Sequence, residues 1–68
     1  MSKGILTARE REVFELLILN KSTKEISTYL GISEKTVRNH ISNVMQKMNV
    51  KGRSGAFIEL LKLGEINL

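Results

Sequence analysis

The chain has 68 residues and no cysteine, which predicts one small domain without disulfide bridges or thiolate metal sites. It has no apolar run long enough to span a bilayer and no secretory signal, which favours a cytoplasmic protein. The net charge is +4, and residues 21–53 concentrate it with seven cations against two carboxylates. This concentration is typical of a protein with a polyanionic partner, although a solubilising surface is an alternative explanation.

The beginning of the chain predicts a first helix. Residues 1–6 show no pattern and are expected to be disordered. Thr7 and Glu10 then have the Thr-x-x-Glu spacing of a capping box, in which each side chain accepts from the backbone N–H of the other residue. The helix should end near Asn20, because asparagine tolerates the left-handed backbone conformation.

The middle of the chain predicts a short and then a longer helix. Ser22 and Glu25 form a second capping signal, and Gly31 ends the short helix because glycine adopts a positive φ without strain. Ser33 caps the longer helix after about three turn residues, and Asn49 is the expected stop. The inward face of the longer helix is expected to consist of Val37, Ile41, Val44, Met45 and Met48.

Ser54 is expected to cap a fourth helix that runs to about Leu63, where Gly64 ends it. This helix has more apolar side chains than one buried face requires. We therefore expect it to supply a self-association surface, the only apolar surface that the core does not use. A small domain that merely exposes some apolar side chains is the alternative. The dimer contacts are expected to be Phe57, Ile58 and Leu61.

The segment 22–48 carries the functional signal. A short helix, a glycine-containing turn and a longer helix with a basic, amide-rich outer face have the sequence form of a helix-turn-helix. The outer face contains Lys35, Arg38, Asn39, Ser42, Asn43 and Gln46. Arginine and lysine suit guanine edges, and asparagine and glutamine suit adenine edges. A solvated helix surface is the alternative, but such a surface normally contains more glutamate.

Two residues of this helix have more than one interpretation. Glu34 lies in the first turn, where a carboxylate interacts favourably with the helix dipole, and it is also suited to accept from cytosine N4. His40 borders the buried face, where packing and a phosphate contact are equally supported. No second ligand lies at metal-binding spacing from it, and no nucleophile or phosphate loop is recognisable. We therefore expect no enzyme activity, catalytic residue, metal, cofactor or small-molecule ligand.

Several segments resemble the DNA-binding domain of LuxR/FixJ-type regulators over nearly the whole chain. These segments are 6–13, 23–26, 32–40 and 47–50, followed by Arg53. The resemblance implies an all-α fold class, a four-helix domain whose helix 34–48 enters the major groove of double-stranded DNA. It implies base contacts by Lys35, Arg38, Asn39, Ser42 and Asn43. It implies phosphate contacts by Thr23, Lys24, Thr36, His40 and Lys47, and dimerisation through the fourth helix.

The resemblance implies a sequence-specific transcription regulator that acts as a homodimer, with RNA polymerase as a further partner and no contact with membranes. The given sequence starts at Met1 and shows no second domain. In this form it resembles a stand-alone regulator of late spore-coat genes. We expect residues 7–68 to form the helix-turn-helix DNA-binding domain, with a C-terminal dimerisation helix. A helical protein-interaction adaptor is one alternative. The isolated DNA-binding fragment of a response regulator is another.

Overall fold

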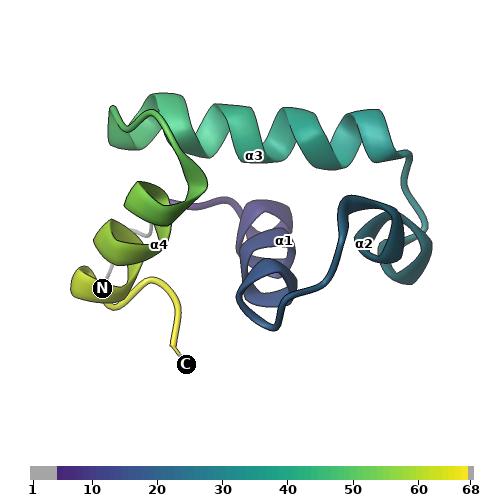
Figure 1. The fold of residues 1–68 in the computed structure, drawn as a ribbon, viewed down its shortest axis with the longest axis horizontal. Coiled ribbons are helices and arrows are strands. Elements are labelled where there is room, and N and C mark those ends of the chain that lie inside the picture. Colours follow the sequence, from purple (N-terminus) through teal and green to yellow (C-terminus); the bar gives the residue numbers. More distant parts are fainter. Residues whose placement is uncertain (1–4, 68) are drawn as a thin grey trace.

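The computed structural model describes residues 5–67, which form four helices joined by short turns (Figure 1). The helices are α1 (Ala8–Ile18), α2 (Thr23–Leu30), α3 (Glu34–Met48) and α4 (Arg53–Lys62). The longest helix, α3, lies along the top of Figure 1, and the other three helices lie below it. The predicted all-α, four-helix fold class is confirmed.

Side chains cap the first three helices at the predicted positions. The Thr7 hydroxyl accepts from the Glu10 N–H at 3.1 Å, and Glu10 Oε1 accepts from the Thr7 N–H at 3.0 Å. Ser22 and Glu25 form the same reciprocal pair at the start of α2. Ser33 caps α3 by accepting from the backbone N–H three residues later. Each cap contributes about 1 kcal/mol because it satisfies a helix N–H that has no partner within the helix.

Left-handed residues lie where the helices were predicted to stop. The φ angles are 69° at Asn20, 70° at Gly31 and 57° at Asn49. Gly31 ends α2, and a Cβ added there would meet nothing within 4 Å. The positive φ, rather than a lack of space, is therefore the reason that the turn between α2 and α3 favours glycine.

The start of α4 differs from the prediction. Gly52, not Ser54, is the N-cap residue, and α4 begins at Arg53 without a side-chain cap. The prediction of a Ser54 cap was wrong because a serine caps a helix only where the backbone leaves the helical conformation. Here Gly52 takes the extended conformation two residues earlier. A Cβ on Gly55 would lie 3.3 Å from Val50 Cβ, so the loop and the first turn of α4 pack closely.

A continuous apolar core joins all four helices. Its buried residues are Leu6, Val13, Phe14, Leu17, Ile26, Val37, Ile41, Val44, Ala56, Leu60 and Ile66. Three of the five residues predicted for the inner face of α3 are thus buried. Met45 and Met48 are only partly buried and pack at the edge of the core.

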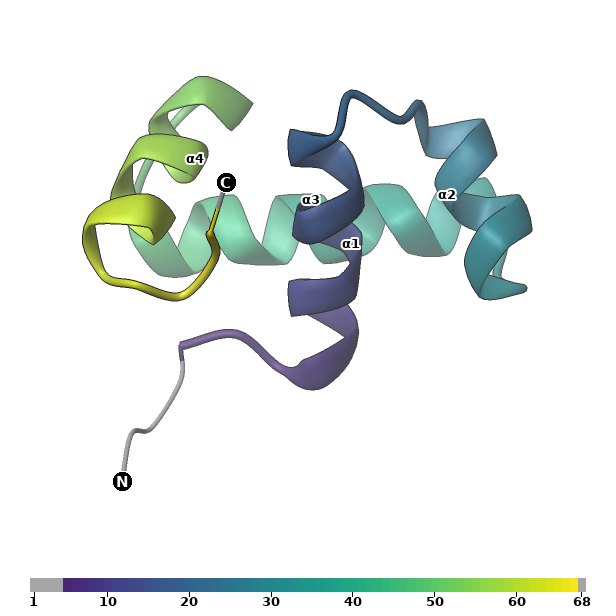
Figure 2. The ribbon, with the colours of Figure 1, turned by 90° about the horizontal axis from the view of Figure 1, so that it is seen from below.

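Both ends of the described chain join this core. Of the segment expected to be disordered, residues 1–4 lie outside the described residues, whereas Leu6 is buried. Beyond α4 the chain returns toward α1 (Figure 2), where Ile66 is buried. Arg11 Nη2 lies 3.0 Å from Glu65 Oε1 and holds this return in place. No helix in the described part of the chain is long and apolar enough to cross a membrane.

Candidate nucleic-acid interface

The outer face of α3 points away from the other three helices (Figure 1). The buried side chains of Val37, Ile41 and Val44 fix this orientation, because α1, α2 and α4 all contact α3 on the inner side. By the helical period, the remaining polar positions fall on the opposite side. The structure exposes all five residues expected to contact bases, Lys35, Arg38, Asn39, Ser42 and Asn43, together with Gln46.

Arg38 keeps most of its hydrogen-bonding capacity. Its Nη1 atom lies 3.6 Å from Glu34 Oε1, one helical turn earlier, and both side chains are about half exposed. An exposed ion pair of this kind is weak, and a guanidinium group has five N–H donors. Arg38 can therefore exchange Glu34 for another acceptor at little cost.

The residues expected to contact phosphate are spread along the helix-turn-helix. Thr23 and Lys24 begin α2, and Thr36 lies in the first turn of α3. The Thr36 hydroxyl lies 2.9 Å from the Ser33 hydroxyl, so it supports the cap as well. His40 is partly buried beside the core, as its place next to the apolar face predicted.

Lys47 has a structural role that the sequence did not indicate. Its Nζ atom lies 2.5 Å from Glu10 Oε1 and 3.2 Å from the Ile5 carbonyl oxygen. Glu10 is only 4% exposed, and the same carboxylate oxygen accepts from the Thr7 N–H. The pair therefore ties the last turn of α3 to the start of α1. An ammonium group has three N–H donors, so one remains for a further acceptor.

The charge of Glu10 is stabilised in this environment. Burial alone raises the pKa of Glu10 because it disfavours the charged carboxylate. Hydrogen bonds from Lys47 and from the Thr7 N–H, and the positive charge of Lys47, outweigh burial and hold the pKa of Glu10 below its ordinary value. The pKa of the exposed Glu25 carboxylate is also lowered, by the hydrogen bond from the Ser22 N–H.

Comparisons with known proteins agree with this geometry. The model for the luxR family of bacterial regulatory proteins matches residues 4–60. The chain belongs to the luxR family. It is 69% identical over 67 residues to spore germination protein GerE of Bacillus subtilis (strain 168), a match that covers 98% of this chain and 90% of that protein. The structure of the transcription factor GerE is similar with a TM-score of 0.93, at 62% identity, and covers 96% of this chain and 97% of that one.

More distant relatives are larger proteins. The chain is 48% identical over 64 residues to the transcriptional regulatory protein DegU of Brevibacillus brevis, and the match covers 94% of this chain but 27% of that protein. These similarities and the helix-turn-helix formed by α2 and α3 show that the luxR-family domain described here is a DNA-binding transcription regulator. Family membership thus assigns it a regulatory rather than an enzymatic role.

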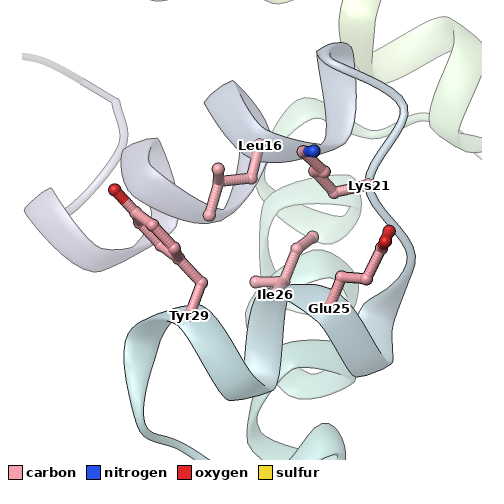
Figure 3. Close-up of a pocket in the computed structure, with 5 residues that line it drawn as sticks. All are labelled: Leu16, Lys21, Glu25, Ile26 and Tyr29. Carbon is pink, nitrogen blue, oxygen red and sulfur yellow. The ribbon is translucent and has the colours of Figure 1, made fainter.

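This luxR-family domain also has a cavity that does not include the outer face of α3. A cavity of about 280 Å³ lies between α1 and α2 (Figure 3), lined by Leu16, Lys21, Glu25, Ile26 and Tyr29. Tyr29 is 76% exposed, and the neighbouring Leu19 is 66% exposed. The prediction that the fourth helix carries the only spare apolar surface was therefore wrong.

Among residues 5–67 there is no group of three or more potential metal ligands.

We predict that Glu10→Gln destabilises the domain by about 1.5–3 kcal/mol at pH 7, the usual effect of losing a hydrogen bond to a charged group. Glutamine suits the same capping position, so the change mainly removes the charge that holds Lys47. Because folding lowers the pKa of Glu10, its stabilising effect is present above the unfolded-state pKa and disappears as the pH falls through the folded-state pKa. Urea unfolding should thus show the difference between wild type and variant shrinking below about pH 4.

Glu12→Gln is the matched control, because Glu12 forms an exposed pair with Arg9 at 3.1 Å. This control should change the free energy of unfolding by less than about 1 kcal/mol at any pH. If the wild-type and Glu10→Gln curves instead stay parallel down to about pH 3, the ionised Glu10 does not stabilise the fold as described.

Proposed function

We propose that this regulator reads duplex DNA sequence with the outer face of α3 in the major groove. The observation that carries the proposal is the exposure of Lys35, Arg38, Asn39, Ser42 and Asn43 on one side of a helix whose other side is buried. Glu34, at the start of the helix, is the only carboxylate in α3, and it pairs only weakly with Arg38. The face therefore presents donors and amides that match base edges.

We propose that Thr23, Lys24, Thr36, His40 and Lys47 contact the phosphate backbone and set the position of α3 in the groove. The start of α2 supports this, because backbone N–H groups and the helix dipole favour an anion there and Lys24 is exposed. Lys47 would contact phosphate with the one ammonium N–H that does not bond to Glu10 or Ile5. Its contribution to binding is thus coupled to its contribution to the fold.

We propose that two copies associate through α4. Ile58 is 54% exposed on this helix, and Leu61 and Phe57 are partly buried. The ring of Phe57 packs edge-on against Phe14, with centroids 5.7 Å apart, so Phe57 also belongs to the core. Ile58 is therefore the residue best suited to probe the interface. A two-fold dimer would present two α3 helices to sites about one turn of DNA apart, roughly 34–36 Å.

We propose a biological role in sporulation, at late spore-coat genes, with action in the cytoplasm and RNA polymerase as a partner. The high identity to the spore germination protein GerE supports the context. The chain is 39% identical over 66 residues to the transcriptional activator protein LuxR of Aliivibrio fischeri. This similarity supports an activating role, for which we propose RNA polymerase as the partner. Leu19 and Tyr29 are exposed and line one surface with other residues of α1 and α2 and none of α3, so this surface would stay accessible to a polymerase on a DNA-bound domain.

Arg38→Ala should weaken binding to the preferred DNA site by about 1–3 kcal/mol and relax the preference at one base pair, because it removes a base contact. Fluorescence anisotropy with preferred and random duplexes measures both effects. Arg9→Ala is the matched control, since Arg9 lies on α1 and pairs with Glu12. An equal loss of affinity for both duplexes would exclude base reading by Arg38.

Ile58→Glu should abolish cooperative binding to a DNA with two half-sites, because a buried carboxylate disfavours the α4 contact. Circular dichroism should show unchanged folding, since Ile58 is exposed in the single copy. Leu19→Glu introduces the same charge at an exposed apolar position outside α4 and should leave cooperativity intact. Persistent cooperativity in the Ile58→Glu protein would place the dimer contact on another surface.

Tyr29→Ala should reduce transcription from activated promoters while leaving DNA affinity unchanged, because the exposed ring would be lost from the polymerase contact. Transcription in vitro with purified polymerase and a spore-coat promoter measures the first quantity, and anisotropy measures the second. Lys62→Ala, an exposed change on α4, is the control. Full activation by the Tyr29→Ala protein would contradict a polymerase contact at this surface.

A further inference from the structure

A small cleft opens where α4 begins beside the middle of α3. Its volume is about 190 Å³, and it is lined by Arg38, Ile41, Ser42, Met45 and Arg53. Two guanidinium groups and one hydroxyl thus border a space that is backed by apolar side chains. No carboxylate lines the cleft. Such a set of donors suits a tetrahedral oxyanion, because guanidinium groups bind such anions with two parallel N–H bonds.

The two arginines differ in their present partners. Arg38 shares its charge with Glu34 at 3.6 Å. Arg53 is exposed, and the structure pairs it with no carboxylate among residues 5–67. Arg53 is therefore the donor in this cleft whose charge is least compensated. Its position in the first turn of α4 follows from the short loop that brings the chain back under α3 (Figure 1).

We propose that this cleft binds one phosphate of the DNA backbone, with Arg53 as the donor. The inference rests on the proposed entry of α3 into the major groove. A helix in that groove has a phosphate strand on each side. The cleft lies at the flank of the outer face of α3, because Arg38 and Ser42 belong to both. Arg38 can then turn to a base while Arg53 holds the adjacent strand.

This contact would add a positioning residue that lies outside the helix-turn-helix. The residues expected to bind phosphate begin α2 or lie on α3, whereas Arg53 belongs to α4. Since α4 also carries the proposed dimer surface, the Arg53 contact would fix the position of that surface relative to the DNA backbone. The docking of α3 would then be set from α2 on one side and from α4 on the other.

The first test compares Arg53→Ala with Lys51→Ala, an exposed cation outside the cleft. Arg53→Ala should weaken binding to preferred and random duplexes by the same factor, on the order of threefold to tenfold, and lower the slope of log affinity against log salt by about one. Lys51→Ala should leave the slope within about 0.3 of the wild-type value. Unchanged circular dichroism and melting temperature establish that the variant is folded.

The second test neutralises single phosphates of the duplex as methylphosphonates. One position in each half-site should weaken binding of the wild type but have no further effect on the Arg53→Ala protein. A free inorganic phosphate site would show no such coupling to one DNA position, and competition by inorganic phosphate at constant ionic strength would reveal it instead. An Arg53→Ala protein that responds to every methylphosphonate as the wild type does would overturn the inference. Failure of the wild type to bind any duplex would instead overturn the proposed function.

Discussion

Burial of the inner face of α3 is the constraint on which the rest of the structure depends. Val37, Ile41 and Val44 lie fully or almost fully buried against side chains from α1, α2 and α4. A fifteen-residue helix rich in polar side chains would be marginal in isolation, so this packing supplies most of its stability. The same packing fixes the rotation of α3 about its axis. The side chains of the outer face therefore already point away from the core when no DNA is bound.

The cations of the domain divide between the fold and the exposed surface. Lys47 and Arg11 hold the first helix to distant parts of the chain through Glu10 and Glu65. Others, such as Lys24, Lys35 and Arg53, are exposed and pair with no carboxylate among residues 5–67. The net charge of +4 does not reveal this division. Cations that pair with a carboxylate contribute little to the electric field outside the domain, so the unpaired cations contribute most of it. The basic stretch 21–53 therefore contributes both to the stability of the small domain, through Lys47, and to its exposed positive surface.

The sequence was most informative where structure is determined locally. Capping boxes, left-handed stops and the period of α3 involve residues three or four positions apart, so the printed sequence shows them directly. The pair of Glu10 with Lys47 spans 37 positions and that of Arg11 with Glu65 spans 54, and no local pattern indicates either. Arg53 was visible as a charge, but its place beside Arg38 depends on the path of the loop. The prediction of a Ser54 cap was wrong for a similar reason, since the path of the loop makes Gly52 the N-cap residue of α4.

The proposed function depends on the outer face of α3 lying in the major groove. Dimethyl sulfate protection tests it directly, because the reagent methylates guanine N7 in the major groove and adenine N3 in the minor groove. With the wild-type protein on its preferred site, we predict protection of guanine N7 in two clusters about one helical turn apart, with adenine N3 still reactive there. Protection confined to adenine N3, with guanine N7 fully reactive across the bound site, would contradict the account.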